Sequence, residues 1–393
     1  MSAISDGVRE RRRLSANCGC CVSIPTTAPT TAGAAVGRRN FLAGGIAALA
    51  LGAAANTVKT STARAQAVGA QAVGAQAAGA QAAGAPAAPR TKIDVHHHFL
   101  PPAHKEALSR HKLGSPKWSV QMSLDDMDKS GVATAVLSQV QPGTYWGDAA
   151  ESRALSRAIN EYGAKLVQEH PGRFGLFATI SPPDTEGSLK EIAYAFDTLK
   201  ADGIGLLTSY QGKYLGDASF APVYDELNRR KAVIYVHPLA PACCEHVVPG
   251  IPPGSIEYAT DTTRTIAHLV FTGMSQKYPD IRWIFSHSGG TPPFLTQRFV
   301  RQQFVQKHPH LPNGPLPEFR KFYYELAQGN TKAQLSALFE MVPVSQAVYG
   351  TDYPYRDGAE VNEGIANWKF SAADLRSIES ETARKLLPHL KSA

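Results

Sequence analysis

The sequence predicts an α/β protein whose ordered part is a single (β/α)8 TIM barrel. Three observations carry this prediction. Residues 90–393 have the length of one large domain. Strand-like and helix-like runs alternate along them, and side chains able to bind a metal follow four of the strands. The eight apolar runs that we expect to be strands lie near residues 92–95, 133–140, 173–180, 204–209, 233–236, 282–286, 322–326 and 346–350.

Amphipathic patterns between these runs predict the helices of the barrel. In residues 151–170, the apolar side chains of Leu155, Ile159, Tyr162 and Leu166 recur at helical spacing and form one stripe. Similar patterns occur at 185–200, 221–230, 262–277, 293–304, 331–341 and 374–387. A doubly wound open sheet is the alternative. The closed barrel is favoured because residues after the first, fifth, sixth and eighth strands converge only if the sheet closes.

The first strand ends in three consecutive histidines. Residues i and i+2 of a strand point to the same face, roughly 7 Å apart. His96 and His98 can therefore direct two imidazoles at one point, while His97 points away. Two imidazoles on one side of a strand end make half of a transition-metal site. A polar strand end that is merely rich in histidine is the alternative for this segment taken alone.

Three later strands also end in a potential metal ligand. They run into His237, His287 and Asp352. A buried strand has no need of an imidazole or a carboxylate at its carboxyl end, and each residue taken singly is more simply a polar group satisfied by a backbone partner. In a parallel barrel, however, the carboxyl ends of all strands share one rim. Four such ends therefore predict a common site.

The first 89 residues do not resemble a globular domain. Residues 38–42 (Arg-Arg-Asn-Phe-Leu) precede a short stretch rich in Ala and Gly, which resembles a twin-arginine export signal, and residues 63–65 (Ala-Arg-Ala) form a candidate cleavage site. We therefore predict an N-terminal extension with a signal peptide over 1–65. Export by the twin-arginine machinery would make the protein periplasmic or secreted. Residues 66–89 repeat Ala, Gly and Gln and are predicted to be a disordered linker to the barrel at 90–393.

Charge and cysteine content exclude two classes of protein. Residues 1–89 hold eight of the Lys and Arg residues and two of the acids, so they carry +6 of the formal net charge of +7. The nearly neutral remainder argues against nucleic acid as a partner. Of the five cysteines, three precede the barrel and two are adjacent in one loop, so no disulfide framework is expected. These cysteines are Cys18, Cys20, Cys21, Cys243 and Cys244.

The motifs at the four strand ends resemble the amidohydrolase superfamily, over residues 91–390. They are Asp-Val-His-His-His at 94–98, His-Pro at 237–238, His-Ser-Gly-Gly at 287–290 and Gly-Thr-Asp-Tyr-Pro at 350–354. The nearest branch is that of the aminocarboxymuconate-semialdehyde decarboxylases. Residues 202–210, 214–217 and 261–264 resemble the 6-methylsalicylate decarboxylase type within it.

The resemblance implies a metal-dependent, non-oxidative decarboxylase of a small aromatic or enoic acid. It implies that one divalent ion, Zn²⁺ with Mn²⁺ as the alternative, is held by His96, His98, His237 and Asp352. Asp352 would also carry a proton. His287 would lie beside the open coordination position as a general base or as a hydrogen-bonding partner of the groups that bind the metal. Arg298 matches an arginine that reaches across a dimer interface to the substrate carboxylate, which implies a homodimer; an ordinary solvated helix arginine is the alternative.

Two departures from the superfamily pattern bear on these roles. Binuclear members carry a metal-bridging lysine on the fourth strand, and residues 204–209 contain none, so we expect one metal. Some decarboxylases have an arginine in the insertion after the first strand. Here residues 102–124 offer one arginine, Arg110, which aligns with no family position. The group that binds the substrate carboxylate is thus open at this stage.

Other functions are compatible with the same residues. Three imidazoles and a carboxylate leave a divalent ion with an exchangeable position, which suits a Lewis acid or a source of hydroxide. A mononuclear hydrolase of a lactone, ester or amide, or a hydratase, is therefore the runner-up. A non-catalytic metal-binding protein of the periplasm is a third hypothesis, but such a protein would have no use for His287 and Arg298.

Overall fold

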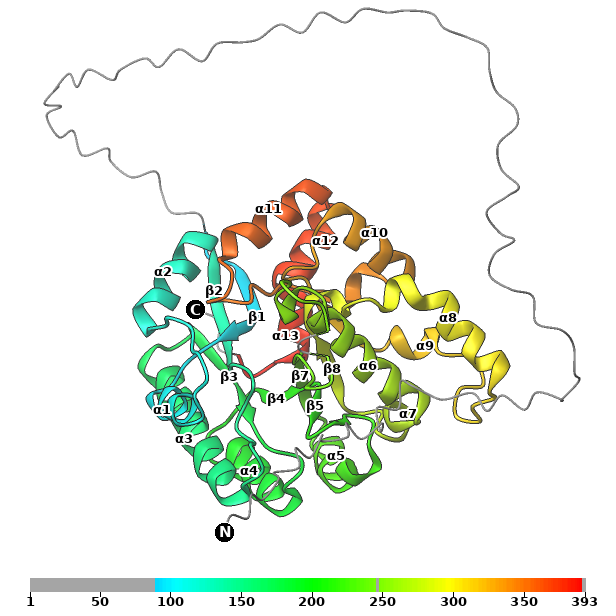
Figure 1. Ribbon diagram of the computed structural model, residues 1–393. Coiled ribbons are helices and arrows are strands. Elements are labelled where there is room, and N and C mark those ends of the chain that lie inside the picture. Colours follow the sequence, from blue (N-terminus) through cyan, green and yellow to red (C-terminus); the bar gives the residue numbers. More distant parts are fainter. Residues whose placement is uncertain (1–88, 245–246, 391–393) are drawn as a thin grey trace, which may run out of the picture. The chain divides into compact units, whose positions relative to one another are not determined.

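The computed structural model describes residues 89–244 and 247–390. In this part of the chain eight parallel strands form one sheet, surrounded by helices (Figure 1). The twin-arginine motif, the candidate cleavage site, most of the linker and the first three cysteines lie outside the described residues. In the order of the sheet, the strands are β1 (Lys92–His98), β2 (Val132–Ser138), β3 (Phe174–Thr179), β4 (Gly203–Leu207), β7 (Val233–His237), β8 (Arg282–Phe285), β9 (Tyr323–Glu325) and β10 (Ala347–Val348).

Backbone hydrogen bonds between the first and last strands close the sheet. The amide of Val95 donates to the carbonyl of Tyr349 at 3.0 Å, and the amide of His98 donates to the carbonyl of Tyr353 at 2.7 Å. In return, the amide of Asp352 donates to the carbonyl of His96 at 2.8 Å. The predicted (β/α)8 barrel is therefore confirmed, and the open sheet is excluded.

The helices on the outside of the barrel agree with most of the amphipathic patterns. Those that match a predicted helix closely are α3 (Ala149–Glu169), α4 (Thr185–Asp197), α5 (Ala221–Arg229), α8 (Pro292–Val305) and α10 (Lys332–Met341). The helix expected at 262–277 begins earlier, as α6 (Glu257–Phe271), and is separated from α7 (Met274–Lys277) by Gly273, whose φ of +83° ends a helix. Among the described helices, none is long and apolar enough to cross a membrane.

Several elements were not expected from the sequence. The insertion after β1 folds into α1 (Pro102–Arg110) and α2 (Val120–Ser130), and β5 (Ser209–Tyr210) pairs with β6 (Lys213–Tyr214) after β4. Further helices are α9 (Leu316–Phe319) and α11 (Gly358–Trp368). The helix expected at 374–387 is broken into α12 (Ala372–Arg376), a π-helical turn at Ser377–Glu381 and α13 (Thr382–Leu386).

The interior of the barrel is a packed apolar layer beneath the rim that carries the histidines. Ile93 and Val95 of β1 belong to this layer, together with Phe177 of β3 and Tyr235 of β7. The rings of Phe177 and Tyr235 stack with their centroids 5.5 Å apart. Ala383 of α13 packs against the same layer. Because side chains fill this layer, a ligand can reach the rim only from the side of the strands' carboxyl ends.

Candidate metal centre

Five side chains that the sequence singled out meet at the carboxyl ends of the strands. Nε2 of His96 lies 3.0 Å from Nε2 of His98, and these two atoms lie 3.0 and 3.2 Å from Oδ1 of Asp352. Nε2 of His237 is 4.0 Å from the same oxygen. The ligand atoms of His96, His237, His287 and Asp352 all lie within 4.8 Å of one another. The donors thus surround one point, and His287 is one of the four residues whose ligand atoms lie mutually close.

A β-bulge directs the two histidines of β1 into this cluster. Ile93 and Val95 face the barrel interior, so strict alternation would turn His97 inward next. The pairing of β1 with β2 shifts register between Asp94 and His97, and such a bulge re-aims side chains. His97 instead bonds through Nδ1 to Asp94 at 2.9 Å and through Nε2 to Ser123 at 3.0 Å.

Asp94 holds the first and last strands together behind the cluster. Its carboxylate accepts the amide of His96 at 3.0 Å and both the amide and the hydroxyl of Thr351, at 3.0 and 2.6 Å. Because Thr351 immediately precedes Asp352, one buried carboxylate fixes the backbone of donors on β1 and on the chain after β10. Asp94 therefore sets the separation between these donors.

The hydrogen bonds of the three closest imidazoles test whether the site fits a metal. Nδ1 of each faces an oxygen: Glu325 Oε1 at 2.8 Å for His96, the carbonyl of Gln139 at 2.7 Å for His98, and the carbonyl of Pro238 at 2.9 Å for His237. A carbonyl only accepts, so Nδ1 of His98 and of His237 carries the proton, and the carboxylate favours the same tautomer in His96. Nε2 of His98 and of His237 is then unprotonated and faces Nε2 of His96, so a cation at this point, either a proton on His96 or a metal ion, satisfies these atoms.

The spacing and the buried carboxylate also fit a metal. Four donors around an ion at bonds near 2.1 Å stand about 3.4 Å apart in a tetrahedron, and the three imidazole Nε2 atoms lie 3.0 to 4.0 Å from Asp352 Oδ1. That oxygen is buried and accepts no hydrogen bond from the described residues. The donor set therefore fits the expected metal site, without identifying which metal it binds.

Burial and neighbouring charges shift the pKa values of these groups in opposite directions. Burial lowers the pKa of His98 and holds the pKa of His237 far below its usual value. Burial acts in the same direction on His96, but the carboxylates of Glu325 and Asp352 on its two sides raise its pKa to about 10. Burial would raise the pKa of Asp352, yet the adjacent imidazoles of His96, His287 and His98 keep it well below the usual range. A positive charge on His96 therefore offsets the carboxylates of Glu325 and Asp352, as a bound metal ion would.

The two oxygens of Asp352 face different partners. Oδ1 is turned to the Nε2 atoms of His96 and His98, whereas Oδ2 lies 3.4 Å from Nε2 of His287 and in close contact with the amide nitrogen of Gln328. One oxygen is therefore placed to bind a metal and the other to exchange a proton with His287. This division is compatible with both roles expected of the residue.

Glu325, at the end of β9, is a buried site residue that the sequence analysis missed. Besides bonding His96, it accepts the amide of His287 at 2.5 Å and that of Ala327 at 2.7 Å. His287 has a φ of +55°, a strained value for a residue with a side chain. Glu325 thus orients one imidazole of the cluster and holds the backbone of another. The sequence feature that could have identified Glu325 is its position, because it is a carboxylate at a strand end, as Asp352 is.

Both arginines considered for the substrate carboxylate lie away from the cluster. Arg110 is exposed on α1 and pairs with Glu106 at 3.0 Å and Glu151 at 3.2 Å. Arg298 is exposed on α8, and no ion pair to it is found among the described residues. Within one protomer, the structure therefore brings neither arginine to the donors.

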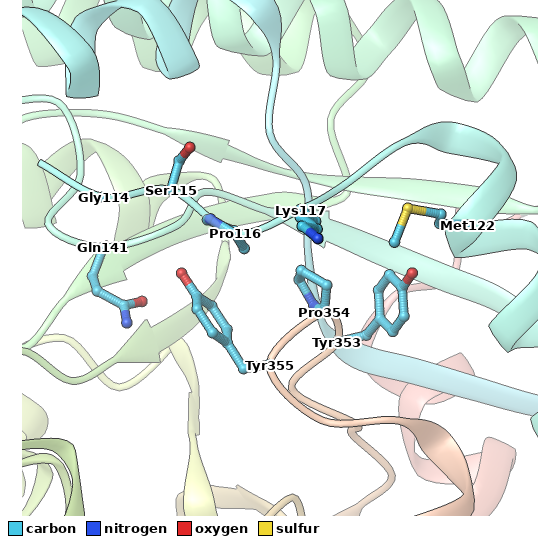
Figure 2. Close-up of a pocket in the computed structure, with 9 residues that line it drawn as sticks. All are labelled: Gly114, Ser115, Pro116, Lys117, Met122, Gln141, Tyr353, Pro354 and Tyr355. Atoms are coloured by element: carbon cyan, nitrogen blue, oxygen red, sulfur yellow. The ribbon is translucent and has the colours of Figure 1, made fainter. Parts of the chain in front are cut away.

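Two cavities lie beside the cluster. One, of about 740 Å³, is lined by the loop between α1 and α2 and by the chain after Asp352. Figure 2 shows Lys117 of that loop across from Pro354 and Tyr355, and the ring of Tyr355 is 5.5 Å from that of His98. The other, of about 230 Å³, is lined by His287, Gln328 and residues from α6 and α8. Both cavities are large enough for a small aromatic acid.

Comparison with known proteins shows the family to which the chain is similar. Residues 93–389 match the family model described as Amidohydrolase. The chain is 36% identical over 323 residues to the decarboxylase macB of Penicillium terrestre, covering 76% of this chain and 96% of the relative. It is 34% identical over 317 residues to the 6-methylsalicylic acid decarboxylase of Penicillium expansum, covering 76% of this chain and 97% of that one.

A solved structure shares the fold at lower identity. The dihydroxybenzoic acid decarboxylase of Polaromonas sp. JS666, crystallised with manganese and the inhibitor 2-nitroresorcinol, superimposes with a TM-score of 0.68. It is 19% identical, and the match covers 77% of this chain and 98% of that one. The structure of this relative contains a metal ion on the same barrel architecture.

Proposed function

Because the chain belongs to the amidohydrolase family, we propose that it is a metal-dependent carboxy-lyase that removes CO₂, without oxidation, from a small aromatic acid of the 6-methylsalicylate type. The observation that carries the proposal is the donor cluster itself, in which His287 stands 3.4 Å from the outward oxygen of Asp352. Relatives at 34–36% identity over almost their whole length carry the names of decarboxylases, which supports this reaction over others on the same barrel.

The metal is held by His96, His98, His237 and Asp352, and His287 stays free for chemistry. Three imidazoles and one carboxylate suit Zn²⁺, while Mn²⁺ is the alternative that the bound manganese of the Polaromonas enzyme supports. A divalent ion supplies Lewis-acid stabilisation of the negative charge that develops on the substrate. The chain's own groups then have to orient the acid and deliver a proton.

The proton balance assigns roles to two residues. When a benzoate loses CO₂, the ring carbon keeps the bonding electron pair and takes up one proton, so ArCO₂⁻ and H⁺ give ArH and CO₂. The pair formed by His287 Nε2 and Asp352 Oδ2 holds that proton close to the donors. The pair delivers it to the ring carbon and is reprotonated from solvent through the cavity that His287 lines.

The test is turnover of a panel of hydroxybenzoates and enoic acids, scored separately for CO₂ release and for cleavage of matched esters and lactones. We expect CO₂ and the decarboxylated phenol from acids with an oxygen ortho to the carboxyl group. 2,6-Dihydroxybenzoate and 6-methylsalicylate differ only in the hydroxyl or methyl group at position 6, so their relative kcat/KM values identify the preferred class. Ester or lactone cleavage without any CO₂ would replace the decarboxylase with the mononuclear hydrolase.

We further propose that the enzyme is a homodimer in which Arg298 of each chain binds the substrate carboxylate in the partner's site. Large apolar side chains at both ends of α8 support an interface there, since Phe294 is 64%, Phe304 79% and Val305 72% exposed. Mixing Arg298→Ala with His287→Asn subunits should restore activity. Each hybrid dimer regains one complete site, so full exchange should return roughly a quarter of the wild-type rate.

Lys117 provides the matched control for that experiment, because it is a cation of the same protomer that lines the larger cavity. If Lys117 rather than Arg298 binds the carboxylate, Lys117→Ala raises KM while Arg298→Ala does not. A monomer in sedimentation analysis, or mixtures no more active than the separate variants, would contradict the shared site.

Finally, we propose that the chain is exported folded by the twin-arginine route to the periplasm or beyond. Arg38 and Arg39 ahead of the Ala-Arg-Ala sequence at 63–65 support this route, and folded export suits a protein that loads its metal before crossing. Replacing both arginines by lysine should abolish export of active enzyme, measured as activity in the periplasmic fraction. Unchanged export of that variant would rule out the twin-arginine route.

A further inference from the structure

The peptide group that joins Pro238 to Leu239 contacts the donor cluster on one side and a buried carboxylate on the other. Its carbonyl faces Nδ1 of His237 at 2.9 Å. Its N–H donates to Oγ1 of Thr208 at 3.2 Å and to Oδ2 of Asp261 at 3.4 Å. The C=O and N–H of one trans peptide lie in a rigid plane and point in opposite directions. Whatever fixes the N–H therefore also fixes the carbonyl that orients His237.

The buried carboxylate that accepts the N–H of Leu239 belongs to Asp261 of α6. It is fully buried, with 0% of its surface exposed. Oδ2 also accepts the hydroxyl of Thr208, and Oδ1 accepts the hydroxyl of Tyr214 at 2.6 Å, while the guanidinium of Arg264 lies 3.7 Å away. Every one of these neighbours donates, so the position requires an acceptor. The two oxygens divide the partners, since Oδ2 holds the peptide and Oδ1 holds the tyrosine.

Two of the three imidazoles, His98 and His237, take their Nδ1 acceptor from the first residue beyond a strand. Nδ1 of His96 is held by the side chain of Glu325 at the end of β9, whereas Nδ1 of His98 faces the carbonyl of Gln139, the first residue after β2. Strand β7 ends at His237, so its Nδ1 partner is the carbonyl of the following loop residue. Without acceptors for the N–H of Leu239, that loop peptide could rotate. The imidazole of His237 would then lose the carbonyl that accepts its Nδ1 proton.

We propose that Asp261 is a positioning residue of the metal centre, which acts through the Pro238–Leu239 peptide to keep Nδ1 of His237 protonated and Nε2 turned to the metal. The inference rests on the proposed role of His237 as a ligand. It gives a function to Asp261, the first residue of the Asp-Thr-Thr-Arg motif at 261–264, which the reaction itself leaves unused.

The test measures Co²⁺ binding by chelator competition, together with the visible absorption spectrum of the Co²⁺-loaded protein. Asp261→Leu, which keeps the size but offers no acceptor, should weaken Co²⁺ binding by about 10-fold or more, the loss seen when outer-shell partners are removed, and should change the spectrum. Tyr214→Phe is the matched control. It removes a bond of similar burial from the other oxygen and should leave Co²⁺ affinity within about 2-fold and the spectrum unchanged.

Two further variants separate positioning from folding. Asp261→Asn can still accept the Leu239 N–H, so it should recover most of the affinity lost in Asp261→Leu. If Asp261→Leu does not fold, Thr208→Val removes the other acceptor of the same N–H at nearly constant volume and should weaken binding in the same direction. Unchanged binding in Asp261→Leu, or an equal loss in Tyr214→Phe, would overturn the inference. A wild-type chain that fails to bind Co²⁺ would instead contradict the metal site itself.

Discussion

Replacing His287 by asparagine should lower turnover by about 10²–10⁴-fold, the contribution expected of a positioned proton donor or acceptor, and should leave the metal bound. The reason is the division of partners around Asp352. His96 and His98 lie 3.0 and 3.2 Å from Oδ1, while His287 lies 3.4 Å from Oδ2. Asparagine cannot carry a proton between the carboxylate and the substrate, although it is close to histidine in shape.

The measurement is kcat for CO₂ release alongside the metal content of the same preparation. His104→Asn is a suitable control, because His104 is also buried but bonds the carbonyl of Gly143 at 3.1 Å, outside the donor cluster. That variant should fold less stably and still turn over. If His287→Asn loses its metal, His287 is itself a ligand, as its place among the four mutually close donors permits. Normal turnover would make it a structural residue.

The sequence revealed the rim residues because strand ends follow a simple rule. The carboxyl ends of parallel strands in a barrel share one edge, so His237, His287 and Asp352 could be placed together without coordinates. The orientation of His96 and His98 was predicted from alternation alone, yet it depends on a register shift between Asp94 and His97. A shift of that kind arises from pairing with β2, which no local pattern in β1 reveals.

Other features depended on contacts distant in sequence. Glu325 ends β9 (Tyr323–Glu325), inside a run at 322–326 that was expected to be a strand, but its role appears only when it meets His96, 229 positions away. No helix was predicted in the insertion after β1, but it contains α1 and α2, and α2 is ended by a local signal, Gly131 with its φ of +76°. The proposed role of Arg298 requires a second copy of the chain. Neither the sequence nor a single protomer shows how two copies would meet.

Removing two imidazoles from the cluster should empty the metal site and abolish turnover. We expect about one divalent ion per wild-type chain, since three Nε2 atoms and Oδ1 of Asp352 form one compact set and β4 carries no bridging lysine. His96→Ala combined with His237→Ala should reduce metal affinity by well over about 100-fold, because even the loss of an outer-shell partner costs about 10–100-fold. Turnover should fall with metal content.

Elemental analysis of purified protein is the measurement, and His97→Asn is the matched control. His97 lies in the same run of histidines, but its nitrogens bond Asp94 and Ser123, so its loss should leave the metal content near one per chain. Wild-type protein stripped by a chelator should regain turnover with a divalent ion, and a comparison of Zn²⁺ with Mn²⁺ then decides the metal. Two ions per chain would contradict the mononuclear site. Full occupancy in the double variant would mean that the cluster is not the site, because His98, His287 and Asp352 alone do not retain the geometry that the five side chains create together.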